Sequence, residues 1–306
     1  MSDKEIFQKL IDNASLIIQG KEEVLRLAFY SFFSGGHLLI EDLPGVGKTT
    51  LSKTLAKLLN LDFKRIQMTN DLLPSDILGY KIYSKEKEAF QLEKGPIFTE
   101  VLLTDELNRA SPKTQSALLE AMEEKVISLE GERFDLSKDF FVIATQNPFG
   151  QIGTFPLPES QLDRFCMKIS IGAPAKNIEV ELLMNSNPVS KIEGLESVVD
   201  ESKIKEIKRN IDQVHISKTL SEYVVNLLNE TRQNDMFQPL SPRAGIGMIS
   251  LVKTKALFEG REFANSDDVI SLAKYVFGHR IHPAVQATVE EGNKLTSTLL
   301  EKVKAP

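Results

Sequence analysis

The sequence of 306 residues contains a single cysteine, Cys166. One cysteine excludes an intramolecular disulfide framework of the kind that stabilises small secreted proteins. No cluster of cysteine and histidine surrounds Cys166, which excludes a structural zinc site there. We therefore expect a cytoplasmic protein.

Long apolar runs and an excess of basic charge are also missing. No apolar run approaches the roughly 20 residues of a membrane span, and residues 1–5 do not form a basic region followed by an apolar stretch. We expect a protein that is neither exported nor embedded in a membrane.

The sequence has 37 Lys and Arg residues and 43 Asp and Glu residues, and its net charge is −6. This balance argues against a dedicated nucleic-acid binder, although it allows local basic patches.

What the sequence does contain is an alternation of apolar strand patterns and helical patterns between residues 37 and 171. Such alternation is typical of α/β proteins with a parallel sheet covered on both faces. Two pairs of short alternating segments, in 80–92 and 126–136, interrupt it, and each pair predicts a β-hairpin. The predicted strands are 37–41, 64–68, 97–104, 140–145 and 166–171, and the predicted helices among them are 49–59 and 114–124.

After residue 171 the strand patterns nearly vanish and helical spacing dominates. Ser241 followed by Pro242 predicts a helix N-terminus, and Pro283 predicts the start of the last helix. We therefore divide the chain near residue 175. The predicted domains are an α/β core, residues 1–175, and an all-α domain, residues 176–306.

The segment 37–50 runs from an apolar strand through a glycine turn into a Lys-Thr pair and a helix. The glycines would let backbone N–H groups turn inward, Lys48 would neutralise the β- and γ-phosphates, and the Thr49 hydroxyl would bind Mg²⁺. Asp42 stands where the G-x-x-x-x-G-K-[ST] pattern has its first glycine. The segment still predicts a site for ATP or GTP, made by Asp42, Leu43, Pro44, Gly45, Val46, Gly47, Lys48, Thr49 and Thr50.

Two further apolar strands end in polar residues that suit phosphate chemistry. Asp105 and Glu106 follow one strand, where Asp105 would hold Mg²⁺ and Glu106 would polarise the attacking water. Asn147 follows another and would orient that water. On their own, the acids could end a strand at a solvated turn, and Asn147 could cap a turn before Pro148.

Arg164 precedes the last predicted strand, and Arg243 opens a helix of the second domain. Phosphoryl transfer places negative charge on equatorial oxygens, and a well-placed arginine can accelerate it about 10³- to 10⁵-fold. Taken singly, an arginine near carboxylates is more often solvated or salt-bridged than catalytic.

Seven motifs in this order resemble the MoxR family of AAA+ ATPases over nearly the whole chain. They are PGVGKT at 44–49, LLPSDI at 72–77, GPIF at 95–98, DELNRA at 105–110, ATQNP at 144–148, LDRF at 162–165 and SPRA at 241–244. The family also carries two inserted hairpins like those predicted above. The resemblance implies Walker A for Lys48 and Thr49, Walker B for Asp105 and Glu106, sensor 1 for Asn147, an arginine finger for Arg164 and sensor 2 for Arg243.

In the family the finger acts on the nucleotide of a neighbouring subunit, so the resemblance implies that Arg164 completes a site in a homo-oligomeric ring, expected to be a hexamer. Arg109 is a second candidate for reaching the neighbour. The implied activity is ATP hydrolysis with Mg²⁺ that drives chaperone-like maturation or remodelling of protein complexes. The implied partner is a protein client, commonly one with a von Willebrand factor A domain.

Three other readings stay open on the sequence. The first is a motor on nucleic acid, although the turn of the second hairpin is acidic, with Glu130 and Glu132, and suits phosphate poorly. The second is the motor subunit of a metal chelatase. The third is a scaffold that binds nucleotide without hydrolysing it.

Overall fold

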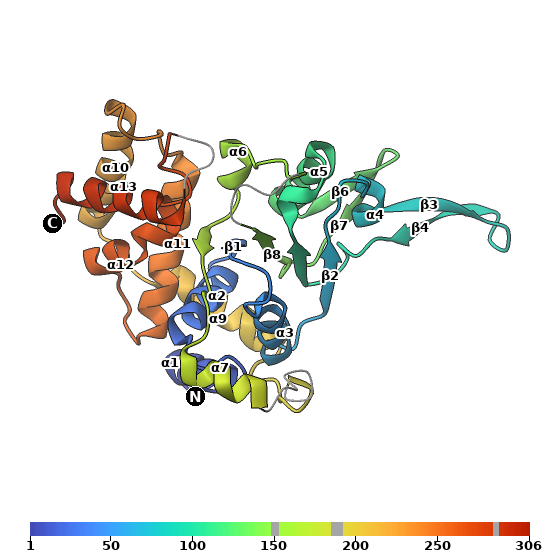
Figure 1. Cartoon of the computed structure of the whole chain (residues 1–306), viewed down its shortest axis with the longest axis horizontal. Helices are drawn as coiled ribbons and strands as arrows, with labels where there is room; N and C mark the ends of the chain where they lie inside the picture. Colours follow the sequence, from blue (N-terminus) through green and yellow to red (C-terminus); the bar gives the residue numbers. More distant parts are fainter. Residues whose placement is uncertain (148–152, 185–191, 284–287) are drawn as a thin grey trace.

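The computed structural model describes residues 1–147, 153–184, 192–283 and 288–306. A sheet of five parallel strands lies at its centre, in the order β2-β5-β8-β1-β9 (Figure 1). The strands are β1 Leu38–Glu41, β2 Phe63–Gln67, β5 Val101–Asp105, β8 Phe141–Gln146 and β9 Met167–Ile169. The predicted α/β class with a parallel sheet is confirmed.

Both faces of the sheet are covered, because side chains of the central strands alternate between two apolar clusters. Leu38 and Ile40 of β1 pack in one cluster, and Leu39 packs in the other. The central strands β1, β5 and β8 are buried along their whole length, as expected for parallel strands between two layers. The predicted strand 97–104 begins only at Val101; Ile97 is buried, but it lies in a turn before the strand.

The helices follow the predicted order, with short 3-10 and α segments between the main ones. They are α1 Asp3–Ser15, α2 Glu22–Phe33, α3 Lys48–Leu58, α4 Pro74–Leu78, η1 Leu107–Arg109, α5 Pro112–Glu124, α6 Glu159–Leu162, α7 Lys176–Met184, α9 Glu201–Gln213, α10 Lys218–Gln233, α11 Pro242–Phe258, α12 Ser266–Phe277 and α13 Val289–Lys302. Within the described ranges, no helix combines the length and the apolar character needed to cross a membrane.

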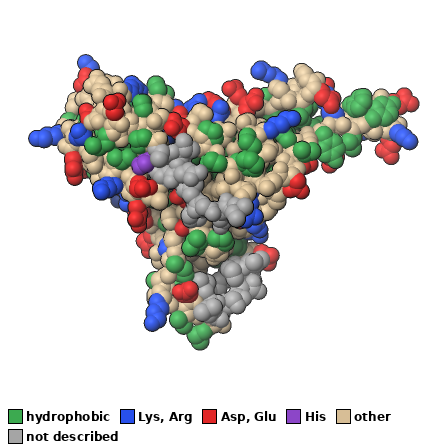
Figure 2. Space-filling model, turned by 45° about the horizontal axis from the view of Figure 1, so that its top comes forward, with side chains coloured by type: hydrophobic (Ala, Val, Ile, Leu, Met, Phe, Trp, Pro, Cys, Tyr) green, Lys and Arg blue, Asp and Glu red, His purple; other side chains and the backbone are tan. Residues whose placement is uncertain are grey.

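Two antiparallel hairpins extend from the α/β core, as predicted. The first is β3 Gly79–Ser84 with β4 Ala89–Lys94, and the second is β6 Val126–Leu129 with β7 Glu132–Asp135. The β3–β4 hairpin projects to the right in Figure 1, and apolar side chains gather on this arm in Figure 2. The exposed apolar side chains of the arm are Tyr80, Ile82, Tyr83 and Phe90.

The C-terminal helices pack against the core rather than standing apart from it. The ring of Phe7 in α1 stacks on Phe258 of α11 with 4.1 Å between the ring centroids, and one apolar cluster contains residues of both halves.

Ser241 caps α11 as predicted, with its hydroxyl accepting the N–H of Ala244. The prediction that Pro283 starts the last helix is wrong: α13 begins at Val289. The capping box of Thr288 and Glu291 sets that start. The domain boundary near residue 175 stays a prediction.

Candidate functional site

The turn between β1 and α3 has the conformation that a phosphate loop requires. Gly45 and Gly47 have φ angles of +87° and +95°, in the region that favours glycine, and Gly47 is the N-cap of α3. A Cβ atom at either position would meet nothing within 4 Å, so the backbone angle rather than crowding explains the glycines. The free N–H groups and the positive dipole end of α3 face this turn and favour an anion there.

Lys48 is the first residue of α3 and is buried. Its Nζ donates a 2.6 Å hydrogen bond to the backbone carbonyl of Asp42. Burial lowers the pKa of the Lys48 ammonium, while the carboxylates of Asp42, Asp105, Glu106 and Glu41 act to raise it. The ammonium therefore lies at the convergence of the loop and several acids, where an anionic ligand would meet it.

The carboxylate of Asp42 binds the chain segment that follows β9. Its oxygens accept hydrogen bonds from the Ser170 hydroxyl at 2.9 Å and from the N–H groups of Ile171 and Gly172. Asp42 thus holds the chain segment after β9 against the loop. Asp42, Leu43 and Val46 are not among the residues that line the cavity at the loop, and Leu43 is exposed.

Thr145, near the end of β8, connects the two acids of β5. Its Oγ1 donates to Asp105 Oδ1 at 2.9 Å and accepts the N–H of Glu106 at 2.9 Å. Thr145 could not be singled out from the sequence alone, because its role depends on the pairing of β8 with β5. Glu106 has φ +57° and ψ +48°, a left-handed conformation that is uncommon for glutamate and costly unless neighbours hold it.

Two side chains hold the Glu106 carboxylate. Asn147 Nδ2 donates to Glu106 Oε1 at 3.0 Å, and Arg109 Nε lies 2.8 Å from Glu106 Oε2. The predicted neighbours Glu106 and Asn147 are thus brought together across β5 and β8. Arg109, the second candidate for reaching another subunit, pairs with Glu106 at the cavity of its own chain, whereas Arg164 lies outside that cavity. Which of the two reaches a neighbour stays a prediction.

Arg65 of β2 is a member of the site that sequence reasoning missed. Its Nη2 lies 2.6 Å from Asp105 Oδ2, and its Nε donates to the same oxygen at 2.9 Å. Gln67 is paired in register with Asp105 and also lines the cavity. Only the pairing of β2 with β5 could have pointed to these residues, because Arg65 and Asp105 are 40 residues apart in the chain.

These groups enclose a cavity of about 320 Å³ at the carboxyl ends of the strands. That volume is within the range of small-molecule sites, and the carboxyl ends of parallel strands are where α/β folds place their ligands. The lining residues are Pro44, Gly45, Gly47, Lys48, Thr49, Thr50, Arg65, Gln67, Asp105, Glu106, Thr145 and Asn147.

The donor set of the cavity fits Mg²⁺ bound together with phosphates. Thr49 supplies a hydroxyl and Asp105 a carboxylate, and both line the cavity. A carboxylate has about four lone-pair sites, so Asp105 keeps capacity beside Thr145 and Arg65. Mg²⁺ usually takes one or two carboxylates plus substrate phosphates rather than an all-protein cage. Consistent with this, the described residues hold no group of three or more His, Cys, Asp or Glu that could bind a metal ion by themselves.

Arg164 and Arg243 lie outside this cavity and converge on one acid. Both guanidinium groups pair with Glu123 of α5, and Arg243 Nη1 also lies 3.7 Å from Asp163 Oδ2. Arg164 Nη1 in addition donates to the carbonyl of Leu119 at 3.0 Å. The sensor 2 role that the resemblance implies for Arg243 stays a prediction, because the guanidinium pairs with these acids and does not line the cavity of its own chain.

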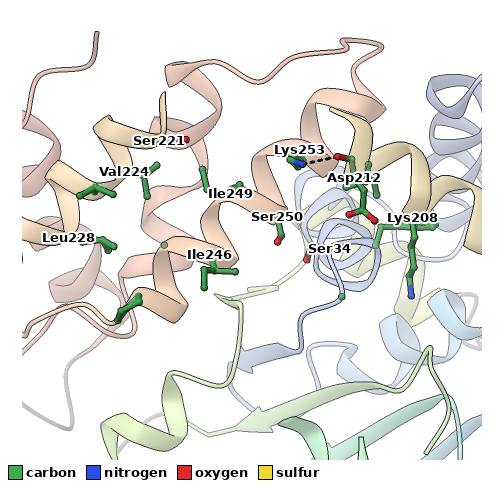
Figure 3. Close-up of a pocket in the computed structure, with 16 residues that line it drawn as sticks. Ser34, Lys208, Asp212, Ser221, Val224, Leu228, Ile246, Ile249, Ser250 and Lys253 are labelled. Carbon is green, nitrogen blue, oxygen red and sulfur yellow. Dashed lines mark hydrogen bonds between the residues drawn. The ribbon is translucent and has the colours of Figure 1, made fainter. Parts of the chain in front are cut away.

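A second cavity, of about 590 Å³, lies between α9, α10, α11 and the end of α2 (Figure 3). Val224, Leu228, Ile246 and Ile249 make much of its wall apolar. Lys253 Nζ donates to the carbonyl of Asp212 at one end. None of the predicted site residues lines it.

Comparison with known proteins agrees with the geometry. The profile of the "ATPase family associated with various cellular activities (AAA)" matches residues 37–167, and the profile of the "AAA lid domain" matches residues 231–300. The "Chaperone MoxR1" of Mycobacterium tuberculosis is 38% identical over 93% of this chain and 78% of that protein. The "Uncharacterized protein YeaC" of Bacillus subtilis is 38% identical over 97% of this chain and 94% of that protein.

A crystal structure from Cytophaga hutchinsonii, provisionally described as an ATPase, superposes with a TM-score of 0.88. It is 34% identical and covers 99% of this chain and 96% of its own. The "Protein MoxR" of Methylorubrum extorquens is 26% identical over 86% of this chain and 84% of that protein. These similarities extend over the core and the C-terminal helices together.

Proposed function

Because the chain belongs to the MoxR family of AAA+ ATPases, we propose that it hydrolyses ATP in the cavity at the phosphate loop and uses the energy to remodel protein complexes. The observation that carries the proposal is the convergence of Lys48, Thr49, Asp105, Glu106 and Asn147 on one cavity. Each of these residue types matches a need of phosphoryl transfer, and they come from three separate elements of the fold.

In this proposal the loop and the first turn of α3 bind the triphosphate. The N–H groups of the turn and the Lys48 ammonium neutralise the phosphates, and the Thr49 hydroxyl and the Asp105 carboxylate hold Mg²⁺. Bound Mg²⁺ would offset the charge that develops between the β- and γ-phosphates. Arg65 fixes the orientation of Asp105, with its Nη2 2.6 Å from Oδ2.

Glu106 polarises the attacking water and Asn147 orients it. The water oxygen forms a bond to the γ-phosphorus while the bond from that phosphorus to the bridging oxygen breaks, and the products are ADP and phosphate. The hydrogen bond from Asn147 and the ion pair with Arg109 hold the Glu106 carboxylate at a defined position. Such fixed geometry is what a water-positioning residue needs.

We further propose that Arg164 and Arg243 act on the nucleotide of a neighbouring subunit in a ring, expected to be a hexamer. Both lie outside the cavity of their own chain and share Glu123, so they can be presented together on one face. A head-to-tail interface would bring that face to the cavity of the next subunit. In this proposal Arg243 acts at the neighbour's nucleotide together with Arg164.

The proposed role is chaperone-like, as the name of the Mycobacterium tuberculosis relative, "Chaperone MoxR1", suggests. The client would be a protein, commonly one with a von Willebrand factor A domain. The turn of the β6–β7 hairpin exposes Glu130 and Glu132, an arrangement that does not favour contact with a nucleic-acid backbone. No feature of the cavity favours the chelatase or scaffold readings over this one.

The decisive experiment compares Lys48→Ala with Glu106→Gln. The Lys48 variant should lose ATP binding measured by calorimetry, because it removes the ammonium at the phosphates. The Glu106 variant should bind ATP with nearly normal affinity but hydrolyse it about 10²- to 10³-fold more slowly, because only water activation is lost. Normal turnover by the Glu106 variant would reject the assignment. If the site is correct, the Glu106 variant with ATP should also retain a protein client in a pull-down.

A further inference from the structure

The side chain of Arg280, just after α12 in the lid profile region (residues 231–300), is buried, with 6% of its surface exposed. All five N–H groups of its guanidinium have an acceptor. Nε donates to Asp163 Oδ1 at 2.8 Å. Nη1 donates to the carbonyl of Cys166 at 3.4 Å and to the carbonyl of Val276. Nη2 donates to the carbonyl of Asp163 at 3.1 Å and to the carbonyl of Phe165 at 2.5 Å. The planar fork is thus saturated.

Four of these five acceptors belong to residues 163–166, which flank Arg164 on both sides. His279, the neighbour of Arg280, adds a contact of 3.1 Å from Nε2 to the carbonyl of Phe165. The carbonyl oxygen can only accept, so Nε2–H of His279 is the donor, and burial lowers the pKa of this ring well below its ordinary value. Two lid residues therefore fix the backbone from which the Arg164 side chain extends.

Asp163 connects the same backbone to the start of α11. Its Oδ2 accepts a hydrogen bond from the Ser241 hydroxyl at 2.8 Å and lies 3.7 Å from Arg243 Nη1. Ser241 is the N-cap of α11. Asp163 thus faces Arg280 with one oxygen and the α11 N-terminus with the other, and Arg164 is the next residue in the chain.

A buried ion pair adds little to the stability of a protein, because the cost of removing two charges from water is about as large as the energy of their attraction. Well-packed apolar residues at the same positions often give equal stability. What a saturated guanidinium fork does provide is a fixed geometry for the groups that it binds. Burial lowers the pKa of Arg280, and the charge and hydrogen bond of Asp163 act to raise it.

We propose that Arg280 and Asp163 are positioning residues for Arg164, so that the lid determines where this subunit places its arginine at the neighbour's nucleotide. The inference rests on the proposed trans role of Arg164. It makes the lid of one subunit a determinant of hydrolysis in the next. Neither Arg280 nor Asp163 lines the cavity of its own chain.

Arg280→Lys tests the proposal, because lysine keeps the charge but cannot reproduce the planar fork. A misplacement of about 1 Å at a catalytic group can cost about 10²-fold in rate, so we expect kcat to fall about 10- to 100-fold. The affinity of the variant for ATP should stay within about threefold of the parent, because its own phosphate loop is intact. Asp163→Asn should give the same split between kcat and affinity.

Arg261→Lys is the matched control. Arg261 also makes a dense set of hydrogen bonds, but its partners Glu259, Phe263 and Asp268 all belong to the lid side of the molecule. This control should lose stability in thermal unfolding yet keep kcat within about threefold of the parent, because it does not touch the backbone around Arg164. A general weakening of the lid would instead lower kcat in both lysine variants.

Mixed assemblies separate positioning from structural damage. An Arg280→Lys subunit has an intact cavity, and a Glu106→Gln subunit has an intact arginine, so their mixture should regain turnover. With random mixing, about one interface in four joins a good cavity to a good arginine. Arg164→Ala mixed with Glu106→Gln serves as the reference, and Asp163→Asn replaces Arg280→Lys if the latter does not assemble.

The two proposals fail in different ways. If the Arg164→Ala mixture recovers turnover and neither the Arg280→Lys nor the Asp163→Asn mixture does, the positioning role is wrong and the trans role stands. Unchanged kcat in both positioning variants would also overturn it. If the Arg164→Ala mixture itself shows no recovery, the trans role of Arg164 is wrong.

Discussion

Replacing Asp42 by alanine should destabilise the protein while leaving its affinity for ATP nearly unchanged. Asp42 stands where a strict phosphate-loop pattern has glycine, yet its carboxylate bonds to Ser170, Ile171 and Gly172 after β9. The contact that Asp42 makes with Lys48 comes from its backbone carbonyl, which the substitution keeps. The carboxylate and the phosphate-binding function are therefore separable.

The size of the effect follows from the three donors. A hydrogen bond to a charged acceptor contributes about 1.5–3 kcal/mol, and a buried donor left unpaired costs about 1–3 kcal/mol. Ile171 is buried, with 5% of its surface exposed, so water cannot readily replace the lost acceptor at its N–H. We expect Asp42→Ala to lower the free energy of unfolding by about 3 kcal/mol. Asp42→Asn should not restore it, because its amide NH₂ would face backbone donors.

Urea unfolding followed by circular dichroism gives the stability, and calorimetry with ATP gives the affinity. Asp71→Ala is the matched control, since Asp71 is exposed and its loss should change stability by no more than about 0.5 kcal/mol. A tenfold or larger loss of ATP affinity in Asp42→Ala at unchanged stability would refute the reasoning, because it would place the carboxylate in the cavity.

Arg109→Ala should hydrolyse ATP poorly and, unlike Arg164→Ala, should recover no turnover when mixed with Glu106→Gln, because Arg109 pairs with Glu106 of its own chain. Recovery in the mixed-assembly assay would make Arg109 the trans-acting residue. Stability should also fall in acid: His37 is buried, its Nδ1 accepts the N–H of Val142, and its pKa is lowered to about 4. The unfolded chain takes up this proton near pH 6.5 and the folded protein only near pH 4, so about 3 kcal/mol is lost as pH falls between them. Urea unfolding at several pH values should show a smaller loss in His37→Gln, and an equal slope in both proteins would contradict the assignment.

The parts of the fold that could be predicted are those that depend on the local spacing of apolar and polar residues. The alternation of strands and helices, both hairpins and the Ser241 cap follow from neighbouring residues, and the structure has them all. Ile97 misled the prediction of a strand start because a buried apolar residue in a turn has the same sequence pattern as one in a strand. Pro283 misled it because a proline favours the first turn of a helix without requiring one, and the capping box at Thr288 decides the start.

Some residues of the candidate site could likewise be predicted from local sequence, and others could not. Asp105, Glu106 and Asn147 could be found because each ends or directly follows an apolar strand, and the ends of parallel strands meet at one edge. Lys48 and Thr49 could be found because a glycine turn leads into them at the start of a helix. Which side chains reach across strands could not be found, because it depends on strand order and register.

Arg65 and the three arginines beyond the cavity are the clearest cases. Arg65 reaches Asp105 only because β2 pairs with β5 in a register that sets Gln67 opposite Asp105. Arg164 and Arg243 meet at Glu123 because three elements pack together there. Arg280 carried no signal in the sequence at all, since its partners are mostly backbone carbonyls that any residue type would supply.

The register of β1 and β9 gives a separate argument for the proposed role of Arg164 at the nucleotide of another subunit. These strands are parallel, with Leu38 opposite Met167, and the phosphate loop follows β1 at its carboxyl end. Arg164 comes before β9, at the amino end of the same pair. The four residues of β1 alone span about 13 Å at 3.3 Å per residue, which is longer than an extended arginine side chain. A guanidinium at the amino end of these strands does not reach phosphates bound at their carboxyl end in the same chain. The proposed catalytic role of Arg164 therefore needs the cavity of a second copy.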